Sequence, residues 1–220
     1  MNNDSPRARR DEPLVYVVDD DDAIRDSLGM LLESMGLAHR VFPSAFAFLE
    51  AYDPEQHACL VADISMTGMS GLDLQEKLNE QRAGIPIVFI TGHGDVPMAV
   101  NAMKAGAADF IQKPFRDQDL LDRINKGLAL DRERRTRRSQ EQKIRHLLEL
   151  LTPRETEIMH RVVRGQANKV IAMDLGVSQR TVELHRARVM RKLKMRSLAE
   201  LVTAVGGLGG EEPSGTAAPR

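Results

Sequence analysis

The residues with the clearest chemical potential are four consecutive aspartates, Asp19, Asp20, Asp21 and Asp22, which follow the apolar run VYVV. Neighbouring carboxylates repel one another, so a folded chain must offset their charge with a cation or with hydrogen-bond donors. We expect Asp19 and Asp20 to bind a divalent cation. We expect Asp21 and Asp22 to cap the following helix, because acidic side chains are favoured beside its first N–H groups.

Three further reactive groups stand at the ends of other apolar stretches. Asp63 ends ACLVAD, Thr91 ends IPIVFIT, and Lys113 follows ADFIQ. Clustered carboxylate oxygens suit Mg²⁺ or Mn²⁺, with water completing the octahedron. A hydroxyl and an ammonium beside such a metal would bind a phosphoryl group, and Asp63 would be the nucleophile that forms an acyl phosphate. Together these groups predict phosphoryl transfer to a protein carboxylate.

The elements that must position these groups are short apolar strands separated by helical patterns. Strands are expected at residues 14–18, 38–42, 58–62, 85–91 and 108–111, and segments such as IRDSLGMLLESM and LDLQEKLNEQ carry apolar residues at spacings of three and four. This alternation predicts a doubly wound α/β domain with a five-stranded parallel sheet. Functional groups in such a sheet gather at the carboxyl ends of the strands, where the acidic residues stand.

The charge of the chain divides it into two halves. Residues 1–125 hold 11 Lys and Arg against 21 Asp and Glu, whereas residues 126–220 hold 20 against 11. This asymmetry indicates that the second half contacts nucleic acid. The single cysteine, Cys59, excludes a disulfide framework, and no apolar stretch reaches the ~18 residues needed to cross a membrane. We therefore expect a cytoplasmic protein.

The second half is expected to be entirely helical. Residues 131–150 read as a solvated helical linker, or alternatively as a continuation of the fifth helix that forms dimer contacts through Ile144, Leu147, Leu148 and Leu151. Thr152 and Glu155 form a capping-box pattern. Helices are predicted near residues 153–163, 168–175, 178–193 and 197–205, and the segment around Gly176 has the helix-turn-helix plan.

From about residue 13 to residue 130 the chain resembles the receiver domains of bacterial two-component response regulators, the FixJ subgroup in particular. The motifs that carry the likeness are VVDD, VADISMTGMSGLDL and ITGHGDVPMAVNAMKAGAADFIQKPF. The resemblance implies a flavodoxin-like fold, phosphorylation of Asp63, and a switch formed by Thr91 and Phe110 beside Lys113, whose bond to Pro114 is expected to be cis. The metal ligands it implies are Asp19, Asp20, Asp63 and the backbone carbonyl of Ser65.

The chain departs from the receiver pattern at Thr67, where the family usually has proline. A threonine returns a backbone N–H donor to the loop and leaves its backbone freer. We expect this change to affect metal affinity and the lifetime of the acyl phosphate, and expect Ser65 and His93 to influence hydrolysis.

Residues 151–205 resemble the DNA-binding domain of LuxR/FixJ-type regulators, through LTPRETEIM and GQANKVIAMDLGVSQRTVELHRARVMRKL. The likeness places the second helix of the motif in the major groove. Base edges would meet Glu183, Leu184 and Ala187, the DNA backbone would meet Lys169, Arg180, Thr181, His185, Arg188 and Lys192, and Arg186 could serve either role. Val182, Val189 and Leu193 are expected to pack inward.

These patterns predict a response regulator rather than an enzyme: a histidine kinase phosphorylates Asp63, and the protein dimerises and binds promoter DNA, with RNA polymerase as a further partner. Two alternatives are a regulator that acts without phosphate and a Mg²⁺-dependent aspartyl-phosphate phosphatase, which needs a second acid where this chain has Ser65. A basic helical bundle that binds protein or RNA is the alternative for the second half. The expected organisation is a flexible N-terminus (1–12), a receiver (13–130), a helical linker (131–150), a four-helix DNA-binding domain (151–205) and a disordered tail (206–220).

Overall fold

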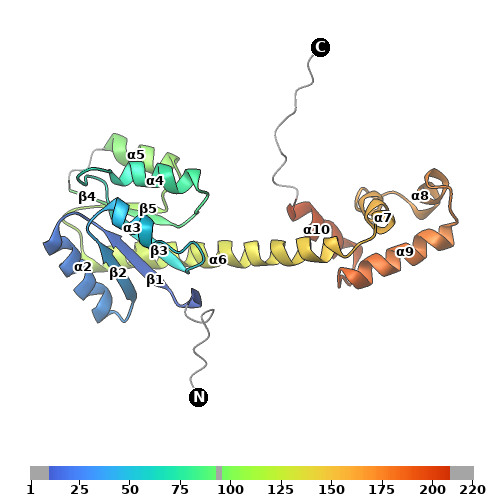
Figure 1. Ribbon diagram of the computed structural model, residues 1–220, viewed down its shortest axis with the longest axis horizontal. Coiled ribbons are helices and arrows are strands. Elements are labelled where there is room, and N and C mark those ends of the chain that lie inside the picture. Colours follow the sequence, from blue (N-terminus) through green and yellow to red (C-terminus); the bar gives the residue numbers. More distant parts are fainter. Residues whose placement is uncertain (1–9, 93–95, 209–220) are drawn as a thin grey trace, which may run out of the picture. The chain divides into compact units, whose positions relative to one another are not determined.

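The computed structural model describes residues 10–92 and 96–208. The chain divides into two compact units, Met1–Arg135 and Thr136–Arg220, and Figure 1 traces both. Each unit is described here by itself. No helix in the described part of the chain is long and apolar enough to cross a membrane.

The first unit is built on five parallel strands, as the alternating pattern predicts. Their order in the sheet is β2-β1-β3-β4-β5. The strands are β1 (Leu14–Val18), β2 (Ala38–Phe42), β3 (Ala58–Asp63), β4 (Ile87–Thr91) and β5 (Asp109–Gln112). Because β1 and β3 are neighbours, the residues that follow them share one edge of the sheet, where the strand order reverses.

Helices cover both faces of this sheet, which explains why its central strands are apolar throughout. Phe48, Leu74 and Ala102 come from the helices of one face and pack with Tyr16 and Phe89. Leu28 and Ile124 come from the helices of the other face. The first face is covered by α3 (Ala45–Ala51), α4 (Gly71–Glu80) and α5 (Val96–Lys104), and the second by α2 (Asp22–Ser34) and α6 (Asp117–Glu149).

Helix α6 has 33 residues and contains almost the whole predicted linker, so the linker is helical and continues the fifth helix. The boundary between the two units falls within it. Of the four residues considered for dimer contacts, Leu147, Leu148 and Leu151 pack against the core of the second unit, whereas Ile144 does not belong to that cluster. Their helical spacing reflects burial within the chain.

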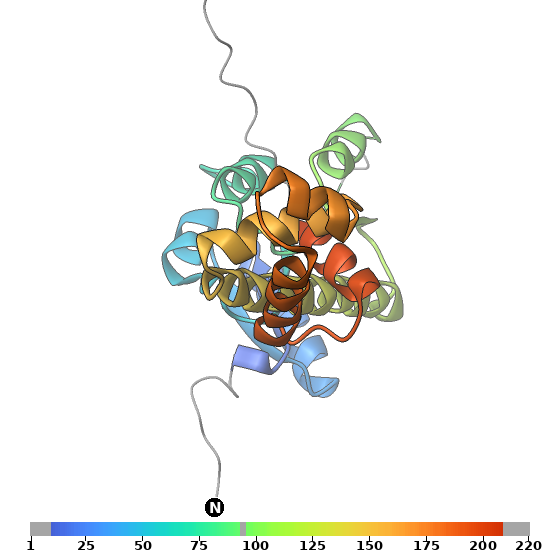
Figure 2. The ribbon, with the colours of Figure 1, turned by 90° about the vertical axis from the view of Figure 1, so that its right-hand side faces the viewer.

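The second unit contains all four predicted helices: α7 (Pro153–Val163), α8 (Asn168–Asp174), α9 (Gln179–Lys192) and α10 (Leu198–Leu208). Figure 2 shows them in orange to red. Their core includes Ile158, Ile171 and Leu201. The capping box before α7 is formed in both directions: the Glu155 N–H donates to the Thr152 hydroxyl, and the Thr152 N–H donates to the Glu155 carboxylate.

The ends of the chain differ from the expected boundaries. Arg10, which was expected in a flexible segment, accepts a hydrogen bond from the His57 N–H at 2.9 Å and pairs with Asp53 at 3.1 Å. Helix α10 continues three residues past the predicted end of the DNA-binding domain, to Leu208. The remainder of both expected terminal segments, residues 1–9 and 209–220, lies outside the described residues.

Candidate functional site

Asp19, Asp63 and Lys113 meet at the carboxyl edge of the sheet. Asp19 follows β1, Asp63 is the last residue of β3, and Lys113 follows β5. The Lys113 ammonium donates to Asp63 Oδ2 at 2.9 Å and to Asp19 Oδ2 at 3.2 Å. The carboxylates of Asp19 and Asp63 therefore share the ammonium of Lys113, although the three residues are far apart in the sequence.

Burial and neighbouring charges shift the pKa values of Asp19 and Lys113. Asp19 is 2% exposed, and its burial raises the pKa of its carboxyl group. Burial alone would lower the pKa of Lys113, but its hydrogen bond to Asp63 and the charges of Asp19 and Asp63 outweigh that effect and raise it. One ammonium thus balances two carboxylates, and negative charge remains at the site.

Asp20 lies beside this pair but has a different partner. Its Oδ2 accepts a hydrogen bond of 2.8 Å from the backbone N–H of Thr67, in the loop between β3 and α4. This hydrogen bond is the main reason that the pKa of Asp20 is lowered. In the same loop, the Ser65 N–H donates to Asp63 Oδ1 at 3.2 Å. Since Lys113 donates to Oδ2, both oxygens of Asp63 accept a hydrogen bond.

The expected metal ligands do not form a preformed coordination site in the described part of the chain. Within residues 10–92 and 96–208, no three carboxylate, imidazole or thiolate side chains are grouped so that they could hold a metal ion directly. The donor chemistry nevertheless fits a hard divalent cation, because Asp19, Asp20 and Asp63 supply three carboxylates against one ammonium and Mg²⁺ keeps several water ligands. Binding would require Asp20 and the loop that holds it to adjust.

The remaining two aspartates of the acidic run serve helix α2. Asp21 is the N-cap residue, and its Oδ1 accepts hydrogen bonds from the N–H groups of Ala23 at 2.8 Å and Ile24 at 3.4 Å. Asp22 is the first residue of the helix and forms an ion pair with Arg25. The prediction that these two aspartates meet the first N–H groups of the helix is therefore confirmed for Asp21, which is the N-cap, and Asp22 lies in the first turn, where an acidic side chain is favoured by the helix dipole.

Thr91 and Phe110 lie on neighbouring strands, with Thr91 at the carboxyl end of β4 and Phe110 near the start of β5. Thr91 is buried and its carbonyl accepts a hydrogen bond from the Lys113 N–H at 2.7 Å. Phe110 is 37% exposed, and its strand position is opposite Phe89. The Lys113–Pro114 bond is cis, as expected. His93 lies outside the described residues.

In the second unit, α8 and α9 form the expected helix-turn-helix, with Gly176 in the turn at φ +63°. Val182, Val189 and Leu193 are buried, which confirms the predicted inner face of α9. The residues predicted to meet DNA that are exposed are Lys169, Arg180, Glu183, Leu184, Ala187 and Arg188. Thr181 and His185 are half-buried.

Two residues predicted to contact DNA also have partners within the chain. Lys192 donates to Glu155 at 2.6 Å and to the carbonyl of Leu150 at 3.0 Å, and Arg186 donates to the side chain of Asn168. The hydrogen bond from Lys192 is the largest of the effects that lower the pKa of Glu155 to about 2. The two hydrogen bonds of Lys192 attach α9 to the start of α7. A one-sided sequence pattern could not show this, because the partner of Lys192 is 37 residues away.

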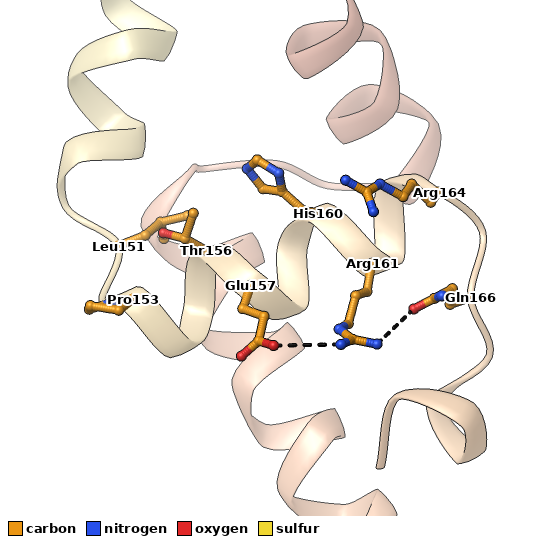
Figure 3. Close-up of a pocket in the computed structure, with 8 residues that line it drawn as sticks. All are labelled: Leu151, Pro153, Thr156, Glu157, His160, Arg161, Arg164 and Gln166. Atoms are coloured by element: carbon orange, nitrogen blue, oxygen red, sulfur yellow. Dashed lines mark hydrogen bonds and ion pairs between the residues drawn. The ribbon is translucent and has the colours of Figure 1, made fainter. Parts of the chain in front are cut away.

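An open pocket of about 670 Å³ lies along the outer face of α7 (Figure 3). Arg161, on its lining, pairs with Glu157 at 3.6 Å, with Gln166 at 3.4 Å and with Asp174 at 2.8 Å. These contacts link α7 to the loop before α8 and to the end of α8. Arg161 therefore has a structural role in this pocket, because it holds α7 and α8 together.

A parallel sheet with paired carboxylates and a lysine at its carboxyl edge defines a receiver domain, and comparison with known proteins agrees. Residues 15–125 match the family model of the response regulator receiver domain. Residues 149–205 match the model of bacterial regulatory proteins of the luxR family.

Relatives with both domains match most of the chain. Transcriptional regulatory protein FixJ of Azorhizobium caulinodans is 45% identical over 205 residues, which cover 93% of this chain and 97% of that protein. The solved structure of the response regulator StyR is 50% identical, with a TM-score of 0.78, and covers 89% of this chain and 98% of its own. Full-length FixJ from B. japonicum is 40% identical, with a TM-score of 0.55 over 90% of this chain and 98% of its own.

The chain belongs to the FixJ-like response regulators of two-component systems, which join a receiver domain to a LuxR-type DNA-binding domain. It is a transcriptional regulator. Membership of this family implies a histidine kinase partner and DNA binding, and receiver domains generally bind Mg²⁺.

Proposed function

We propose that Asp63 accepts the phosphoryl group from the partner histidine kinase. The observation that carries this proposal is Lys113, whose ammonium lies 2.9 Å from Asp63 Oδ2 and 3.2 Å from Asp19 Oδ2. One Asp63 oxygen attacks phosphorus while the bond to the donor nitrogen breaks, and the nitrogen leaves with the electron pair. Lys113 holds the carboxylate in place and meets the negative charge of the incoming phosphoryl oxygens.

The candidate ligands of the metal are Asp19, Asp20, Asp63 and the carbonyl of Ser65. Mg²⁺, or Mn²⁺ in its place, would neutralise charge on the phosphoryl oxygens and orient them. The unmatched negative charge of the three carboxylates supports this assignment. Because the second acid of a phosphatase is replaced by Ser65, we propose that the protein assists only its own phosphorylation and dephosphorylation.

Phosphorylation adds about two negative charges at neutral pH, at the sheet edge where Thr91 ends β4. We propose that the Thr91 hydroxyl turns toward the phosphoryl oxygens. The ring of Phe110 then moves inward. The support for this switch is that Phe110 is partly exposed on β5 while Thr91 is buried at the end of β4. The rearranged face then promotes dimerisation.

The exposed side of α9 is the proposed DNA-reading surface. Glu183, Leu184 and Ala187 are assigned to base edges in the major groove. Lys169, Arg180, Thr181, His185, Arg188 and Lys192 are assigned to the DNA backbone, and Arg186 to either role. Leu184 is 51% exposed although it is large and apolar, which fits contact with a partner surface.

The remaining proposals concern the cellular context and the extent of the domains. We place the protein in the cytoplasm, with RNA polymerase as a further partner at the promoter. We take residues 13–130 as the receiver, 131–150 as the helical linker and 151–205 as the DNA-binding domain.

The test is promoter binding by the full chain with and without acetyl phosphate and Mg²⁺, compared between wild type and Asp63→Asn. We expect the phosphodonor to tighten wild-type binding and to leave the variant unchanged. A variant that responds like wild type would contradict the role of Asp63 and favour a regulator that acts without phosphate. Arg188→Ala, a backbone contact, should lower the salt dependence of binding by about one unit of slope.

A further inference from the structure

We infer that the backbone N–H of Thr67 is a latch that holds Asp20 and competes with the divalent cation for its carboxylate. The inference rests on the proposed function, because it concerns the metal that supports phosphorylation of Asp63. Thr67 is not one of the proposed metal ligands, and the inference gives it the role of positioning one of them, Asp20.

The latch begins with a single hydrogen bond across the site. The Thr67 N–H donates to Asp20 Oδ2 at 2.8 Å, although the two residues are 47 positions apart. A donor of this kind exists only because residue 67 is not proline, which has no N–H. The loop residue that departs from the receiver pattern is therefore the one that grips the acidic run.

The two ends of the loop are fixed, so its tip can hold Asp20 firmly. The Ile64 N–H donates to the carbonyl of Ile90 at 3.1 Å, and the Gly71 N–H donates to the carbonyl of Ile64 at 2.9 Å. A Cβ on Gly71 would lie 2.3 Å from the Asp63 carbonyl, so the return of the chain requires glycine. Met66 and Met69 are buried on either side of the exposed tip.

The electrostatics show why the latch and the cation compete. The hydrogen bond from the Thr67 amide stabilises the ionised Asp20 carboxylate. A cation would stabilise the same charge through the same oxygens. Asp19 and Asp63 share Lys113, whereas Asp20 is compensated mainly by the loop. A metal that binds Oδ2 displaces this donor, and a metal that binds Oδ1 draws negative charge away from Oδ2 and weakens the hydrogen bond.

The test is Mg²⁺ binding to the full chain by calorimetry, without a phosphodonor, in wild type, Thr67→Pro and Thr67→Val. Valine keeps the N–H and the branched shape and loses only the hydroxyl, so it is the matched control. We expect Thr67→Pro to bind Mg²⁺ about tenfold more tightly, the factor that one hydrogen bond to a charged group supplies. Thr67→Val should bind Mg²⁺ like wild type, because it keeps the N–H that donates to Asp20.

A second measurement does not depend on how the proline variant folds. In wild type, the Thr67 amide should be protected from hydrogen exchange without Mg²⁺ and lose protection when Mg²⁺ is added. In Asp20→Ala, the same amide should exchange rapidly under both conditions.

Equal Mg²⁺ affinities in all three proteins, or Thr67 exchange that Mg²⁺ does not alter, would overturn the latch while leaving the metal site in place. Wild-type protein that binds no Mg²⁺ at all would instead contradict the proposed metal site, and the latch with it.

Discussion

Each unit of this protein sets a lysine against a buried carboxylate, and the two arrangements differ in how completely the charge is matched. In the helical unit, Lys192 lies 2.6 Å from Glu155, whose carboxylate also accepts from the N–H and the hydroxyl of Thr152. Every partner there comes from the chain itself. The pair joins α9 to the first turn of α7 and stabilises the fold.

In the receiver, Lys113 serves two carboxylates at once, and Asp20 adds a third negative charge nearby. Burial raises the pKa of Asp19, whereas the pKa of Glu155 is depressed to about 2. A site that keeps negative charge unmatched is stabilised further by a cation or a phosphoryl group with its metal. The comparison therefore indicates that Lys192 stabilises the fold, whereas Lys113 belongs to a site that binds a ligand.

Removing each lysine should break the comparison most strongly. Lys192→Met leaves Glu155 buried without its main donor and should destabilise the helical unit by about 2 kcal/mol, whether or not Mg²⁺ is present. Lys113→Met should destabilise the receiver, and millimolar Mg²⁺ should recover much of that loss, because the cation takes over the compensation of Asp19 and Asp63.

Denaturation followed by two signals separates the units. Tyr16 and Tyr52 are the only tyrosines and the chain has no tryptophan, so tyrosine fluorescence reports on the receiver, while circular dichroism also follows the helical unit. Rescue of Lys192→Met by Mg²⁺, or no rescue of Lys113→Met, would remove the distinction.

Acid should sharpen the comparison. The folded-state pKa of Glu155, about 2, lies below its ordinary value of 4.5, so the ionised group stabilises the helical unit above pH 4.5 and loses that effect as the pH falls toward 2. At pH 3.5 the loss should be about 1.5 kcal/mol. Equilibrium unfolding between pH 5.5 and 3.5 measures it, and Glu155→Gln should flatten this part of the profile. A wild-type profile as flat as that of Glu155→Gln would contradict the assignment.

The smallest predicted effects are the losses of stability caused by substituting Asp21 and Asp22. Asp21→Ala should destabilise the receiver by about 1 kcal/mol, the cost of a lost N-cap. Asp22→Ala should cost only a few tenths of a kcal/mol, because the Asp22 side chain is 89% exposed and its ion pair with Arg25 is screened by solvent. Both variants should still be phosphorylated. Equal losses of stability from the two variants would show that the cap is not confined to Asp21.

The sequence predicted the sheet and the meeting of Asp19, Asp63 and Lys113 because both follow from short-range signals. Apolar runs define strands, and parallel strands carry whatever follows them to one edge. The capping box at Thr152 and Glu155 was equally local, since its two halves are three residues apart.

What the sequence could not give were partners distant along the chain. The linker leucines, the Lys192 contact with Glu155 and the hydrogen bond from Thr67 to Asp20 depend on tertiary packing. In each case the residue type fits more than one role. Leu147 suits a dimer seam as well as a core, and Lys192 suits a phosphate as well as a carboxylate.

The most direct test of the central claim is the mass of the intact protein after incubation with acetyl phosphate, with and without Mg²⁺. We predict one added phosphoryl group on wild type in the presence of Mg²⁺, none on Asp63→Asn, and none on Asp20→Ala under the same conditions. A phosphoryl group on Asp63→Asn, or equal labelling of wild type without any divalent cation, would contradict a metal-assisted phosphoacceptor site at Asp63.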